Sequence, residues 1–114
     1  MVVDLFTARR IEAILDGYIE VKVPPEVRSS VRLKYEWDEG KLTLFEERSY
    51  SNGREWIRSA IVQFRMELKK WTVYIKTANH DWEVFRSIRP DPDFEQQLEK
   101  VELDREGIFW VEED

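Results

Sequence analysis

The stretch Val31-Arg32-Leu33-Lys34-Tyr35-Glu36-Trp37-Asp38 decides the fold, because apolar and charged residues alternate through its whole length. A period of two places successive side chains on opposite faces of an extended chain, so the stretch predicts a β-strand with one buried face. Asp38-Glu39-Gly40 follows and supplies the glycine that a tight hairpin loop needs for a positive φ. A returning strand is therefore expected from Lys41 to Arg48.

A second turn signal extends the sheet by a third strand. Asn52-Gly53 is a strong hairpin dipeptide, and the alternation after it predicts a strand from Trp56 to Leu68. A strand of that length, at about 3.3 Å per residue, exceeds most strands, so we expect a bulge or bend near Ser59-Ala60. The alternation predicts that one face of this strand carries Ala60, Val62, Phe64, Met66 and Leu68.

Two more strands complete the predicted sheet. Lys69-Lys70 is a polar turn, and strands are expected at Trp71 to Thr77 and at Trp82 to Ile88. The loop Ala78-Asn79-His80-Asp81 joins them. Because every connection is short, we expect about five antiparallel strands in meander order.

Helices are predicted on both sides of the sheet region in the chain. Apolar residues recur at three- and four-residue steps from Leu5 to Ile19, with Asp4 or Thr7 as the N-cap, and Pro24-Pro25 prevents continuation. Asp91 before Pro92 matches an N-cap followed by proline at the first helical position, so a short second helix is expected there.

This second helix is expected to lie on the sheet and to end in the turn Asp104-Arg105-Glu106-Gly107. The apolar segment Ile108 to Trp110 is expected to dock on the core or to pair at a sheet edge. The predicted fold class is α+β: an N-terminal helix, an antiparallel meander of about five strands, and a short C-terminal helix packed on the sheet.

Length and charge restrict the class of protein. A chain of 114 residues with 42% hydrophobic residues predicts one domain spanning residues 1–114. The formal net charge of −6, from 18 basic and 24 acidic residues, repels phosphate backbones, so nucleic acid is not an expected partner. The N-terminal residues contain no secretion signal and no apolar run approaches the roughly 20 residues that span a bilayer, so we expect a cytoplasmic protein without membrane contact.

The sequence contains no recognisable catalytic or metal-binding motif. There is no cysteine, and the single histidine, His80, lies in a predicted turn. Phosphate-binding glycine patterns and metal-binding helix motifs are missing, and the nearest match to a nuclease pattern, Glu67-Leu68-Lys69, is a common triplet in charged sequences. We therefore predict no catalytic residue, no metal ligand and no cofactor.

Aromatic residues are unusually abundant, at 13% of the chain, and most are expected to pack in the core. In a functional alternative, one or two of them line a concave surface on the other face of the sheet, together with Arg48, Arg58 or Arg86. Other basic strand residues are common devices for solubility; they are Arg32, Lys34, Arg65 and Lys76. The candidate ligand-binding residues are Arg48, Tyr74, Trp82 and His80.

A set of short motifs occurs in an order that resembles a known family. The motifs are Val23-Pro24-Pro25, Val31-Arg32-Leu33, a Glu-Arg pair ending at Arg48, Trp71-Thr72-Val73-Tyr74, Trp82-Glu83-Val84-Phe85, and Asp104 leading to Gly107-Ile108-Phe109-Trp110. Together they resemble the domain-of-unknown-function family numbered 3024, a family of short bacterial proteins. The resemblance spans nearly the whole chain, and it implies no activity and no catalytic residue.

The sequence favours an interaction or small-ligand-binding module that uses an aromatic and arginine surface of the sheet, with a protein or a small molecule as its partner. The alternative is an enzyme, hydrolase or nuclease-like, with a carboxylate and arginine pocket on the sheet. An exposed edge strand that pairs two copies into a homodimer is a third possibility.

Overall fold

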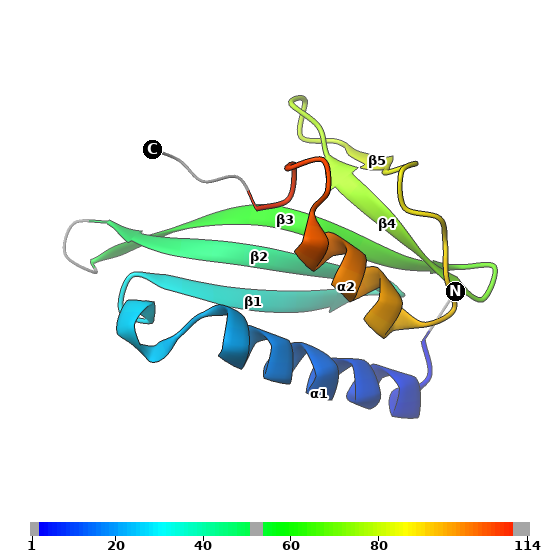
Figure 1. The fold of residues 1–114 in the computed structure, drawn as a ribbon, viewed down its shortest axis with the longest axis horizontal. Coiled ribbons are helices and arrows are strands. Elements are labelled where there is room, and N and C mark those ends of the chain that lie inside the picture. The colour runs from blue at the N-terminus through cyan, green and yellow to red at the C-terminus, as the bar shows by residue number, and fades with distance from the viewer. Residues whose placement is uncertain (1–2, 51–53, 111–114) are drawn as a thin grey trace.

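The computed structural model describes residues 3–50 and 54–110, and these form the predicted α+β arrangement (Figure 1). Five strands form one antiparallel sheet in the order β1-β2-β3-β4-β5, which confirms the meander. The elements are α1 (Leu5–Lys22), a 3₁₀ turn (Pro25–Val27), β1 (Val31–Asp38), β2 (Lys41–Tyr50), β3 (Glu55–Glu67), β4 (Lys70–Lys76), β5 (Trp82–Val84) and α2 (Phe94–Leu103).

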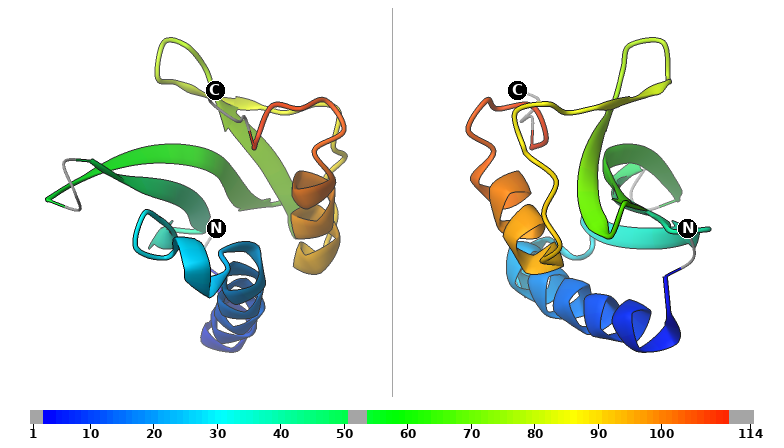
Figure 2. Two further views of the ribbon diagram at one scale, coloured as in Figure 1. Left: turned by 60° about the vertical axis from the view of Figure 1, so that its left-hand side comes forward. Right: turned by 90° about the vertical axis from the view of Figure 1, so that its right-hand side faces the viewer.

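Both helices pack on the same face of the sheet (Figure 2). From β1, the Tyr35 hydroxyl donates to Asp16 of α1, and the Trp37 indole N–H donates to Glu12. Because the side chains of paired residues share a face, the register Tyr35–Leu44–Val62 extends this helix-covered face across β2 and β3. In the described part of the chain, no helix covers the opposite face, which we call the open face.

The predicted bulge in β3 is confirmed, close to the expected place. Leu44 pairs with Val62, whereas the next residue of β2, Phe45, pairs with Ala60, so Ile61 is the extra residue. The shift corrects one prediction: Ala60 lies beside Phe45 on the open face, opposite to Val62. A bulge changes the side on which later residues point, which a simple alternation cannot anticipate.

The ends of four strands also differ from the prediction: β2 continues to Tyr50, and β4 begins at Lys70 and ends at Lys76. Leu68 is not in β3 but in the turn that follows, where Leu68 and Lys69 both have positive φ and the Leu68 side chain is exposed. β5 ends at Val84 instead of Ile88, because the chain leaves the sheet and returns to pair Asp91 with Trp71 of β4. The predicted Asn52-Gly53 turn lies outside the described residues.

The helix caps follow the sequence at one end of the chain and not at the other. Asp4 caps α1 by accepting from the Thr7 N–H, as predicted, and the helix continues through Gly17 to Lys22. The N-cap of α2 is Asp93, not Asp91. The Asp91 carboxylate instead accepts the Asp93 N–H, and the Asp91 backbone forms two hydrogen bonds with the backbone of Trp71. Neither described helix is long and apolar enough to cross a membrane.

The core is centred on Trp71, which is almost fully buried. Its ring packs edge-to-face on Phe94 of α2 at 5.4 Å and lies 6.4 Å from the ring of Trp37 of β1. Its carbonyl accepts from Asp91 N–H and from the amide of the fully buried Gln97, which also donates to the Arg89 carbonyl. Gln97 therefore joins α2 to β4 and to the linker before α2.

The C-terminal segment docks on the core through one carboxylate. Asp104 ends α2 in the left-handed conformation, and its side chain accepts the backbone N–H groups of Ile108, Phe109 and Trp110. Burial alone would raise the pKa of Asp104, but these three hydrogen bonds outweigh it and hold the pKa below its usual value. Phe109 is thereby buried, packing edge-to-face on Phe85 at 5.3 Å, which confirms the predicted docking.

Replacing the buried amide that joins α2 to β4 is expected to destabilise the fold. Gln97→Leu removes both donated hydrogen bonds and leaves the Arg89 carbonyl without this donor, so we expect a loss of about 1–3 kcal/mol in the free energy of unfolding. The exposed neighbour provides the control, because Gln96→Leu should change stability by less than about 0.5 kcal/mol. Urea denaturation measures both, and equal effects would contradict this role of Gln97.

Candidate functional site

The open face concentrates basic side chains, although the whole chain is acidic. The strand register places seven basic and four acidic side chains on it, in a chain whose net charge is −6. The basic residues are Arg32, Lys34, Lys41, Arg58, Arg65, Lys70 and Lys76, and the acidic residues are Glu36, Asp38, Glu47 and Glu67. The open face is therefore locally cationic and the remainder of the chain correspondingly more acidic.

At one end of the open face, two arginines share one carboxylate. Arg32 and Arg58 donate to opposite oxygens of Glu47, at 2.7 Å and 3.0 Å, and Arg58 also pairs with Glu36. Each guanidinium lies over an aromatic ring: Arg32 is 3.7 Å from the centre of Trp56, and Arg58 is 4.4 Å from that of Phe45. We call these residues of β1, β2 and β3 the Glu47 cluster.

The carboxylate at the centre of this cluster is ionised at neutral pH. The hydrogen bond from Arg32, followed by that from Arg58, holds the pKa of Glu47 below its ordinary value and outweighs the opposing effect of burial. Glu47 is only 8% exposed. The cluster thus fixes the planes of two guanidinium groups on the surface of the sheet.

At the other end of the open face, the same pairing of cation and ring recurs. Arg65 lies 3.8 Å from the centre of the Tyr74 ring, and Lys76 lies 5.7 Å from that of Trp82. The Tyr74 hydroxyl donates to Glu67, and burial, followed by this hydrogen bond, raises the pKa of Tyr74. We call Arg65, Glu67, Tyr74, Lys76 and Trp82 the Tyr74 cluster.

A buried polar pair on β2 and β3 lies between the two clusters. Gln63 donates to the Thr43 hydroxyl at 2.8 Å, and Arg65 donates to the Gln63 carbonyl oxygen at 2.6 Å. Both Thr43 and Gln63 are buried, although they belong to the open face. Long charged side chains therefore cover the centre of this face.

The four candidate residues from the sequence do not form one site. Tyr74 and Trp82 share the open face on neighbouring strands, because Tyr74 pairs with Val84 and Lys76 with Trp82. Arg48 pairs with Val31 on the helix-covered face, and its guanidinium donates to Glu46. His80 is exposed in the turn between β4 and β5, with a φ of 65°.

Arg32 and Glu47 are not among the four candidate residues, and the register of the β1–β2 hairpin is the sequence signal that identifies them. A two-residue loop at Glu39-Gly40 fixes Trp37 opposite Leu42, and counting outward pairs Arg48 with Val31 and Glu47 with Arg32. That count alone places Arg48 on the core side and Arg32 beside Glu47. The positions of Arg65 and Trp56 could not be found in this way, because the bulge at Ile61 separates them along β3.

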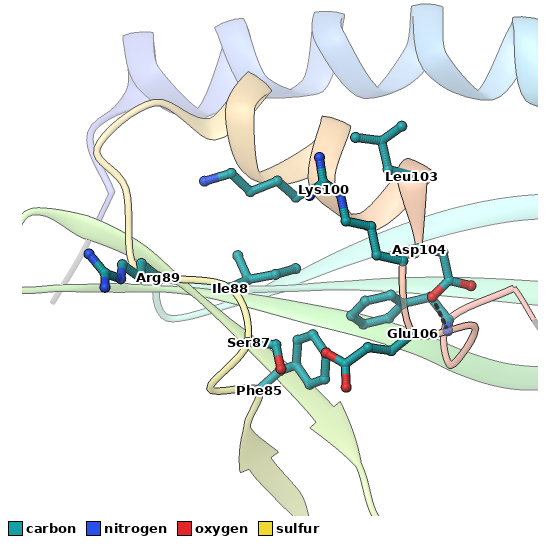
Figure 3. A pocket seen from close by; sticks show the side chains of 10 residues that line it. Phe85, Ser87, Ile88, Arg89, Lys100, Leu103, Asp104 and Glu106 are labelled. Atoms are coloured by element: carbon teal, nitrogen blue, oxygen red, sulfur yellow. Dashed lines mark hydrogen bonds between the residues drawn. The ribbon is translucent and has the colours of Figure 1, made fainter.

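A pocket of about 390 Å³ lies between the linker that follows β5 and the end of α2 (Figure 3). Its apolar lining comes from Phe85, Ile88, Leu103 and Phe109. Three basic residues also line it, and none forms an ion pair within the described residues: Arg89, Lys100 and Arg105. Its volume is near the lower limit of about 300 Å³ for ligand sites.

Two carboxylates line this pocket, Asp104 and Glu106. Both oxygens of Asp104 already accept backbone N–H groups, so its carboxylate is structural. Across residues 3–50 and 54–110, no group of three or more histidine or acidic residues is arranged to hold a metal ion.

Comparison with known families agrees with the resemblance in the sequence. The family described as domain of unknown function DUF3024 matches residues 3–111. The chain belongs to this family. Membership of DUF3024 assigns no activity and no site residue to the chain. No curated protein and no solved structure matches the chain. The open face of this DUF3024 chain is therefore interpreted from its own geometry.

Neutralising the carboxylate of the Glu47 cluster is expected to give a pH-dependent loss of stability. The folded-state pKa of Glu47 lies below its unfolded value, so its contribution is complete above about pH 4.3 and is lost as pH falls through the folded pKa. Glu47→Gln should cost about 1 kcal/mol at pH 7, because both arginine partners are partly exposed, and the cost should shrink as pH falls through the folded pKa.

Chemical denaturation at several pH values measures this difference. Glu99→Gln, on the exposed side of α2, is the control and should show no such pH dependence. A stability difference between wild type and Glu47→Gln that stays constant from pH 7 to pH 2 would contradict the assignment.

Proposed function

We propose that the protein is a binding module, not an enzyme, and that the open face of its sheet binds an anionic partner. The observation that carries the proposal is the excess of basic side chains on this face of an acidic chain. A local field of one sign attracts the opposite charge, even when the net charge of the protein opposes it.

The unpaired lysines support this proposal. Lys34, Lys41, Lys70 and Lys76 have no carboxylate partner within the described residues, whereas Arg32 and Arg58 are neutralised by Glu47 and Glu36. A lysine without an internal partner remains available to a bound anion. The arginines are held in place by the sheet, and the lysines supply the net charge.

The state of the titratable groups favours binding over catalysis. Tyr74 has a raised pKa and Glu47 a lowered one, so both are moved away from neutrality, where a general acid or base needs to titrate. These shifts instead keep the tyrosine hydroxyl protonated and the carboxylate ionised. Fixed charge states suit a recognition surface.

Heparin provides a polyanion to test the open face without a known ligand. We expect wild-type protein to be retained on immobilised heparin at low ionic strength, and the variant Lys34→Gln, Lys41→Gln, Lys70→Gln, Lys76→Gln to elute at clearly lower salt. Removing four phosphate-like contacts weakens a salt-dependent interaction strongly. Circular dichroism establishes that the variant is folded.

A charge-matched variant on the helix-covered side is the control. Arg9→Gln, Arg10→Gln, Lys100→Gln, Arg105→Gln changes the net charge by the same amount and should leave retention nearly unchanged, because these residues lie on or beside the helices. Wild-type protein that flows through the column, or equal losses in both variants, would overturn the proposal.

A further inference from the structure

The two clusters of the open face repeat one arrangement, a cation over an aromatic ring. Four of the five such contacts among the described residues lie on this face. Arg58 and Arg65 pair with Glu47 and Lys41, which stand six positions apart in β2, roughly 20 Å at about 3.3 Å per residue. The face therefore offers separated stacking positions with lysines around them.

We infer that the anionic partner of the open face is a single-stranded nucleic acid. This inference rests on the proposed function and names the class of partner. Proteins that bind single strands combine a positively charged path for the backbone with flat groups on which bases stack, over about 4–16 nucleotides. The open face supplies both features on one antiparallel sheet.

The Glu47 cluster fits the stacking of a base. Guanidinium planes stack on bases as aromatic rings do, and Glu47 holds the planes of Arg32 and Arg58 against Trp56 and Phe45. A base placed on either guanidinium would continue a stack that already exists. These side chains are already ordered in the free protein, so binding loses little of their conformational entropy.

The Tyr74 cluster offers the second position. Trp82 is half-buried on the edge strand β5, with Lys76 near its ring, so one molecule can meet an indole and an ammonium group together. Phosphates can then reach Lys34, Lys41 and Lys70 around the same face. An acidic peptide would pair with the lysines and leave the aromatic rings without a role, so the aromatic content favours the nucleic acid.

The acidic remainder of the chain does not prevent this contact. Exposed charges farther away than about 8 Å are largely screened at physiological salt. The net charge of −6, which disfavours nucleic acid as a partner, averages over both faces. Because the basic side chains gather on the open face, the net charge of the whole chain does not exclude nucleic acid from this face.

The test measures binding of fluorescein-labelled 12-nucleotide oligothymidylate and oligouridylate by fluorescence anisotropy, with a fluorescein-labelled 12-residue poly-glutamate peptide and a 12-base-pair duplex as comparisons. We expect the single strands to bind at least tenfold more tightly than either comparison, with affinity falling as salt rises. This comparison uses wild-type protein and needs no variant.

Two variants test stacking separately from charge. Trp82→Leu and Trp56→Leu should each weaken oligonucleotide binding roughly tenfold while leaving heparin retention unchanged. The Trp82 ring stacks on a base, the Trp56 ring holds the Arg32 guanidinium on which a base stacks, and heparin needs only the charge. Trp82→Phe should recover much of the loss, and Lys69→Gln in the β3–β4 turn should have little effect.

The outcomes separate this inference from the proposed function. Poly-glutamate or duplex binding as tight as single-strand binding, or oligonucleotide affinity indifferent to Trp56 and Trp82, would overturn the inference of a single-stranded partner and leave an anion-binding face. Failure to bind heparin and every labelled anion would overturn both.

Discussion

The packing of Trp71 is the interaction on which the rest of the structure depends. Its ring contacts α2 through Phe94 and lies near Trp37 of the far strand β1, while its backbone pairs with Asp91 and accepts from Gln97. One residue of β4 therefore fixes the position of α2 and of the linker before it, and its ring fills the core between α2 and β1. A large aromatic side chain dominates a small core in this way because it buries about 150–250 Å².

Assigning one face of the sheet to this core determines what the other face can be. Strand alternation sends every second side chain to the open face, where no helix shields it, and these side chains are mostly charged. They bury their stems on neighbouring rings and satisfy one another through Glu47, Gln63 and Glu67. The cationic and aromatic surface is thus a consequence of covering the sheet on one side only.

Local pattern predicts the parts of this fold that depend on neighbours in sequence. β1 and the Asp4 cap follow from adjacent residues, whereas the end of β5 and the start of α2 depend on the pairing of Asp91 with Trp71, a contact between distant residues. The same division applies to the candidate site. Tyr74 and Trp82 were identifiable as aromatics of adjoining strands, but the union of Arg32, Glu47 and Arg58 requires the register of three strands, and Arg48 was excluded by that register. Gln97 carries no sequence signal, because a glutamine on a helix is ordinarily exposed.

The meander order has a consequence for the route by which the chain folds. Each strand pairs with the strand before it, so sheet formation proceeds through hairpins that close over short loops, and the entropy lost in each closure is small. The joins between distant parts of the chain, such as Lys22 with Glu102, can form only after both helices exist. Chains dominated by local contacts fold quickly. A sheet that assembles in sequence order would spend little time with unpaired edges, so this topology limits the interval in which partly folded chains can associate.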